Sequence, residues 1–71
     1  MNKLREVRVV KRISQFRLGL NTGIHQSKIS LIENGLVQPR DDEKRKFAKA
    51  LGVMVKEIWG AEDENTKNIQ K

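Results

Sequence analysis

The sequence contains no cysteine, so it has neither a disulfide framework nor a thiolate metal site. Its single histidine excludes most zinc sites as well, and we expect no metal and no cofactor. No apolar run approaches the roughly 20 residues that a membrane-spanning helix needs. The start, MNKLREVRVV, lacks the apolar stretch and small-residue cleavage site of a signal peptide. We therefore expect a cytoplasmic protein that does not enter a membrane.

Patterns typical of enzymes are also missing from the sequence. It has no nucleophile with a nearby base, no glycine-rich phosphate loop and no cluster of metal ligands. The acidic run 62–64 is consecutive, whereas a calcium loop needs alternating ligands. We expect no enzymatic activity and no catalytic residue.

The positive charge is unevenly distributed along the chain, whose net charge is +6. Residues 1–50 contain 12 Lys or Arg and 5 Asp or Glu, a net charge of +7, whereas residues 51–71 contain 3 and 4, a net charge of −1. A basic domain attracts polyanions, and nucleic acid is the commonest of them. The alternative is that the charge serves solubility alone.

Glycine and proline divide the chain into short helical patterns. We expect one all-α domain over residues 1–60 and a polar, flexible tail over residues 61–71, in which Ile69 is the only large apolar residue. Helices are expected over residues 2–12, 15–22, 26–34, 41–51 and 55–59. The first turn and a half of the helix over 41–51 has no apolar residue, so we expect it to be solvated or frayed.

The first expected helix carries an inward stripe of Leu4, Val7 and Val10. Arg8 lies beside this stripe, and a buried arginine needs a carboxylate because an unpaired buried charge costs several kcal/mol. Glu33 follows the inward-facing part of another helix and would repel phosphate if it pointed outward. The sequence therefore predicts an Arg8–Glu33 ion pair.

The centre of the chain, residues 15–34, reads as two short helices joined by a tight turn. Gly23 lies at the bend, where a positive φ favours glycine, and Gly19 lies one turn earlier, where a side chain would hold crossing helices apart. This spacing is typical of a helix-turn-helix, whose second helix lies in the major groove of DNA. The residues on its outward side, which would contact base edges, are Gln26, Ser27, Lys28, Ser30 and Leu31. The alternative is an ordinary polar helix face.

Several residues outside the proposed base-contacting face also carry expectations, some with an alternative. Phe16 and Leu20 lie four residues apart, and we expect them to pack against the first or fourth helix, with a partner surface as the alternative. Arg17 lies in the first turn of its helix, where a cation opposes the helix dipole; a nearby phosphate would compensate for this, so we expect Arg17 to contact a DNA phosphate. His25 is expected at the N-cap of the next helix as a solvent-exposed turn residue. Trp59 is expected to cover the core, with a dimer contact as the alternative.

Several motifs together resemble one known family, and they extend from Leu4 to Trp59. They are Ser14–Gln15, Leu18–Gly19, Gly23–Ile24, Ile29–Ser30, Ile32–Gly35, Pro39 and Phe47–Val53. This set resembles the phage repressor/Cro-like helix-turn-helix family, also called the xenobiotic-response-element family. The resemblance implies a five-helix lambda-repressor-like domain, with the helix-turn-helix formed by helices 2 and 3, that binds double-stranded DNA sequence-specifically as a homodimer on a palindromic operator.

The resemblance also implies roles for single residues. Gln15 is similar to a residue that clasps the DNA backbone, and Gln26, Ser27 and Leu31 resemble the residues that contact bases. Further phosphate contacts are implied for Arg12, Asn34 and Arg40, and the Arg8–Glu33 pair looks like a family feature. The sequence departs from the family at Gly19 and Thr22, where alanine and an apolar residue are usual, and both changes should loosen the second helix.

Two functional hypotheses follow from the sequence. The first is a DNA-binding transcriptional regulator, expected to act as a repressor. The second is an antitoxin-like or other protein-interaction module with the same fold, whose contact with a protein partner would be made by Phe16, Leu20 and the C-terminal tail.

Overall fold

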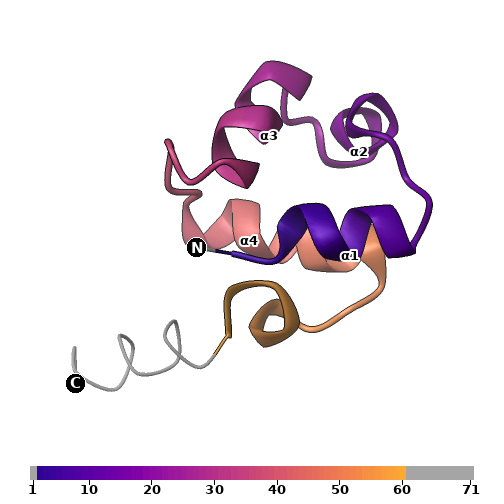
Figure 1. Cartoon of the computed structure of the whole chain (residues 1–71), viewed down its shortest axis with the longest axis vertical. Coiled ribbons are helices and arrows are strands. Elements are labelled where there is room, and N and C mark those ends of the chain that lie inside the picture. Colours follow the sequence, from indigo (N-terminus) through magenta and orange to yellow (C-terminus); the bar gives the residue numbers. More distant parts are fainter. Residues whose placement is uncertain (1, 61–71) are drawn as a thin grey trace.

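The computed structural model describes residues 2–60, and this part of the chain folds into helices without a strand (Figure 1). The labelled helices are α1 (Leu4–Val10), α2 (Gln15–Thr22), α3 (Gln26–Glu33) and α4 (Asp41–Leu51). A fifth helical segment covers residues 55–60. The expected all-α class is therefore confirmed. Over the same residues no helix has the length and apolar character needed to cross a membrane. The tail expected over residues 61–71 lies outside the described residues.

Helix α1 is shorter than expected, because Arg12 has a φ of 59° and turns the chain away from the helix. Asn2 precedes the helix: its Oδ1 accepts a hydrogen bond from the Leu4 N–H, and its Nδ2 donates to the Ile32 carbonyl. The prediction that Val10 faces inward is wrong, since Val10 is 79% exposed. A spacing of three residues drifts by about 60° per step around a helix, so the stripe that starts at Leu4 has left the core by Val10.

Helices α2 and α3 are joined by a short turn that local interactions define. The Ser14 hydroxyl accepts a hydrogen bond from the Arg17 N–H and caps the start of α2. Gly23 ends this helix with a φ of 76°. The Thr22 hydroxyl donates to the Leu18 carbonyl and accepts from the Ile24 N–H. Thr22 is buried with its hydroxyl hydrogen-bonded, and it is the last residue of α2.

The first turn of α4 is anchored, and the expectation that it would be solvated or frayed is wrong. Glu43 is only 3% exposed. Its Oε1 accepts from the Arg40 N–H at 2.9 Å and its Oε2 accepts from the Lys28 Nζ at 2.7 Å. A buried and paired carboxylate thus holds the start of α4, where the sequence offers no apolar residue.

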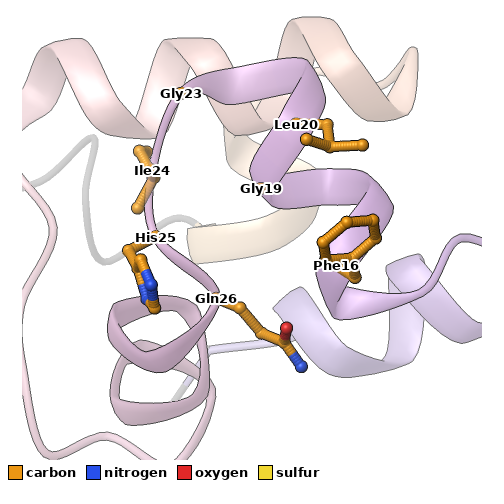
Figure 2. A pocket seen from close by; sticks show the side chains of 7 residues that line it. All are labelled: Phe16, Gly19, Leu20, Gly23, Ile24, His25 and Gln26. Atoms are coloured by element: carbon orange, nitrogen blue, oxygen red, sulfur yellow. The ribbon is translucent and has the colours of Figure 1, made fainter.

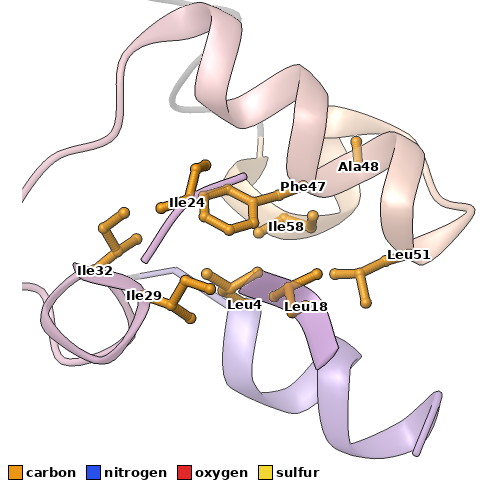
Figure 3. Close-up of a cluster of buried hydrophobic side chains, with 9 residues drawn as sticks. All are labelled: Leu4, Leu18, Ile24, Ile29, Ile32, Phe47, Ala48, Leu51 and Ile58. Carbon is orange, nitrogen blue, oxygen red and sulfur yellow. The ribbon is translucent and has the colours of Figure 1, made fainter. Parts of the chain in front are cut away.

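The core lies between all of these helices (Figure 3). Its fully buried side chains are Phe47, Leu4, Leu18, Ile29, Ile32 and Ile58. The Lys3 N–H donates to the Ile58 carbonyl and joins the start of the chain to the fifth helix. Trp59 is partly buried, with its ring 6.0 Å from the ring of Phe47, in agreement with the expected covering of the core.

Candidate functional site

The start of α3 projects polar side chains away from the core. Gln26 and Ser27 are exposed, whereas Ile29, Ile32 and Glu33 of the same helix are buried. Of the other residues that the sequence places on the outward face, Leu31 is exposed and Ser30 is partly buried. The buried side fixes the helix, so its polar side is presented in one orientation.

His25 caps this helix with its own side chain. Its Nδ1 accepts a hydrogen bond from the Ser27 N–H at 3.0 Å and lies 2.9 Å from the Ser27 Oγ. Accepting the N–H requires an imidazole that is unprotonated at Nδ1. The ring is exposed, as expected of a turn residue.

Lys28 turns from the outward face toward α4. Its Nζ lies 2.7 Å from Glu43 Oε2, and this hydrogen bond is the main reason that the pKa of Glu43 lies below its usual value of 4.5. The hydrogen bond from the backbone of Arg40 lowers the pKa of Glu43 further, against the opposing effect of burial. In this arrangement the Lys28 ammonium joins α3 to α4.

A second buried carboxylate connects the first three helices. Arg8 donates from Nε to Glu33 Oε2 at 2.6 Å and from Nη2 to Oε1 at 3.3 Å. Gln15 Nε2 donates to Glu33 Oε1 at 3.0 Å, and Arg5 Nε lies 3.6 Å from the same oxygen. The Glu33 side chain has no exposed surface. The predicted pair of Arg8 and Glu33 thus lies in a cluster that also sets the position of Gln15 at the start of α2.

The remaining residues that are predicted to contact DNA phosphates are all exposed. Arg12 precedes α2 and Arg17 lies in its first turn, while Asn34 caps the end of α3. The Asn34 Nδ2 donates to the Ser30 carbonyl at 2.9 Å. Arg40 precedes α4, and its guanidinium lies 3.3 Å from Asp42 Oδ1 and 3.6 Å from Glu43 Oε2.

Phe16 and Leu20 form an exposed apolar pair, and the expectation that they pack against α1 or α4 is wrong. They are 61% and 65% exposed. Helix α2 buries Leu18, and residues two positions before and after it point about 160° away from it. Helical geometry around the inward Leu18 was the signal that could have placed them outside.

The pair borders an open hollow of about 400 Å³ between α2 and the start of α3 (Figure 2). Phe16 and Leu20 lie on one side of this hollow, Ile24, His25 and Gln26 on the other, and Gly19 lines it without a side chain.

Comparison of the chain with models of known families, with curated proteins and with solved structures gave no match. Among residues 2–60, no group of three or more His, Cys, Asp or Glu side chains could hold a metal ion.

Proposed function

We propose that the protein is a sequence-specific regulator of transcription that binds double-stranded DNA with α3 in the major groove. The observation that carries this proposal is the exposure of Gln26 and Ser27 at the start of a helix whose other side is buried. A glutamine side chain can bond both N6 and N7 of adenine, and a serine hydroxyl can bond any base. A helix fixed by its buried side can present these groups in a reproducible orientation.

The distribution of charge supports the same proposal. The sequence has no Asp or Glu from Val7 to Ile32, a stretch with five cations. Two of these, Arg8 and Lys28, are paired with buried carboxylates. Lys11, Arg12 and Arg17 are exposed and form no ion pair within residues 2–60, so they are available to phosphates on either side of the groove.

The likeness of the motifs to the phage repressor/Cro-like family supports a lambda-repressor-like arrangement and a dimer. In such a dimer two copies of α3 would enter successive turns of the major groove on an inverted repeat. We propose repression as the outcome, because a domain of this size bound over a promoter would exclude other proteins from it.

Selection of bound sequences from random duplex DNA at two salt concentrations tests this proposal. We expect an inverted repeat whose half-sites lie about one helical turn, roughly 34 Å, apart. The logarithm of the affinity should fall with the logarithm of the salt concentration with a slope of about −3 per subunit, because Lys11, Arg12 and Arg17, which form no ion pair within residues 2–60, are the three cations available to phosphates on either side of the groove. Failure to enrich any sequence would refute sequence-specific binding.

Substitution of Gln26 tests its contact with a base. Gln26→Ala should weaken binding to the selected site by about 1–3 kcal/mol and leave binding to random DNA nearly unchanged. Asn21→Ala, which removes an exposed amide from α2, is the matched control and should alter neither. An equal loss on both kinds of DNA would remove Gln26 from the base contacts.

A further inference from the structure

The hollow beside Phe16 and Leu20 has an apolar surface, and an exposed cation lies near it on α2. Arg17 does not line the hollow, but it lies three residues before Leu20, so these two side chains are neighbours on the helix surface. The nearest carboxylates in the sequence are Glu6, an exposed residue of α1, and Glu33, which is buried against Arg8. Within residues 2–60 the Arg17 guanidinium forms no ion pair.

We propose that this hollow binds an acidic segment of a partner protein. An apolar side chain of the partner would lie between Phe16 and Leu20, and a carboxylate beside it would pair with Arg17. Exposed aromatic residues and arginine are enriched at protein–protein interfaces. The open hollow of about 400 Å³ can receive an inserted side chain. Gly19 does not itself provide this space, because a Cβ there would lie 2.9 Å from the Ile24 carbonyl oxygen.

The chemistry of the hollow favours a protein over DNA and over a second copy of this chain. Protein–DNA interfaces are more polar than protein–protein interfaces, and neither Phe16 nor Leu20 can bond a base edge or a phosphate. A two-fold contact between copies would bring both Arg17 cations into one interface, and none of the described residues that line this patch supplies a carboxylate to pair with them. An acidic partner satisfies both the apolar pair and the cation.

The position of the hollow gives the partner a regulatory effect, which rests on the proposed function. Gln26 lines the hollow and is also the main proposed base contact. A segment seated there would cover Gln26 and neutralise Arg17, so it would compete with DNA. The protein would then be released from its operator when the acidic partner is present.

A selection with displayed peptides tests the proposal without DNA. A library of random helical peptides is selected on the full chain and counter-selected on the Phe16→Ala/Leu20→Ala variant. Since both side chains are largely exposed, the midpoint of thermal unfolding of this variant should lie within a few degrees of that of the parent protein. We expect the enriched peptides to carry apolar residues four apart, flanked by more Asp and Glu than the library. Each should bind the double variant at least tenfold more weakly.

Two controls locate the binding. Met54→Ala removes a comparably exposed apolar side chain outside the hollow and should leave peptide affinity unchanged. Arg17→Glu should weaken the acidic peptides at least tenfold. The absence of enriched peptides, an enrichment without acidic residues, or equal binding to the double variant would overturn the proposal.

Two further measurements distinguish a protein partner from the other possible occupants of the hollow, which are DNA and a second copy of this chain. The double variant should bind the selected DNA within about twofold of the parent protein and sediment at the same mass. A tenfold loss of DNA affinity would assign the hollow to DNA, and a change of mass would assign it to a second copy; either result overturns the proposal. An enriched peptide should displace DNA when the proposed function holds. If no DNA binds at all, the peptide selection still tests the hollow.

Discussion

The guanidinium of Arg8 and the carboxylate of Glu33 join α1 to α3 across 25 residues of sequence, with 2.6 Å between Nε and Oε2. Arg8 also donates from Nη1 to the Ile13 carbonyl, and Glu33 also accepts from Gln15. The carboxylate therefore has partners on α1 and on α2 while it belongs to α3. This arrangement positions the beginning of α2 relative to the proposed base-contacting helix.

Removal of Glu33 should destabilise the whole domain. Glu33→Ala leaves Arg8 beside the core without its partner, and breaking a buried ion pair from one side costs about 3–5 kcal/mol. We expect a large fall in the midpoint of thermal unfolding followed by circular dichroism. Glu6→Ala, at an exposed position of α1, is the control and should change the midpoint little. An unchanged midpoint for Glu33→Ala would show that the pair does not stabilise the fold.

The turn between α2 and α3 should depend on the backbone conformation of Gly23. Its φ of 76° is unfavourable for a residue with a Cβ, although a Cβ there would meet no atom within 4 Å. Gly23→Ala should therefore cost about 1 kcal/mol through the backbone alone, and Gly23→Asn should cost less because asparagine tolerates this conformation. Urea unfolding measures the free energies of unfolding, which should decrease in the order parent protein, Gly23→Asn, Gly23→Ala. Equal stability of the Gly23→Ala variant and the parent protein would contradict the requirement for a positive φ.

The cap of α3 should depend on an acceptor at position 25. His25→Ala removes the bond to the Ser27 N–H and should cost about 1 kcal/mol, whereas His25→Ser restores an acceptor and should recover most of this loss. The same unfolding assay separates the two variants. If the serine variant is as unstable as the alanine variant, the imidazole contributes something other than the cap.

Local interactions explain which parts of the fold could be predicted from the sequence. The bounds of α2 and α4 follow from a serine cap, from glycines with positive φ and from apolar spacing, all of which act within a few residues. Burial of Glu33 could also be predicted, because an arginine beside the apolar stripe of α1 needs a carboxylate. The outward placement of Ser27 follows from the two inward isoleucines of its own helix, from which it points about 140–160° away.

Interactions between distant residues explain what could not be predicted. The start of α4 is anchored by Lys28, which lies 15 residues from Glu43, and no local pattern indicates this bond. The exposure of Phe16 and Leu20 depends on which face of α2 the neighbouring helices cover. Helical geometry alone puts Phe16 and Leu20 on the side away from Leu18, but it takes the tertiary arrangement to show that Leu18 is the residue that faces inward.

The bond between Lys28 and Glu43 should make stability depend on pH in a defined direction. The pKa of Glu43 is lowered in the folded protein, so the charged carboxylate stabilises the fold above the ordinary value of 4.5. This contribution is lost as the pH falls through the lowered pKa. Glu43→Gln should therefore be less stable than the parent protein by about 1–3 kcal/mol at pH 7, and this difference should narrow as the pH falls below 4.5.

Urea unfolding of both proteins from pH 7 to pH 3 measures this difference directly. Other carboxylates titrate in the same range, but they are common to both proteins and cancel in the comparison. Glu6→Gln, which changes an exposed carboxylate, should show a small difference at every pH. A difference for Glu43→Gln that stays constant down to pH 3 would mean that the lost stability comes from packing at the start of α4 and not from the charge of Glu43.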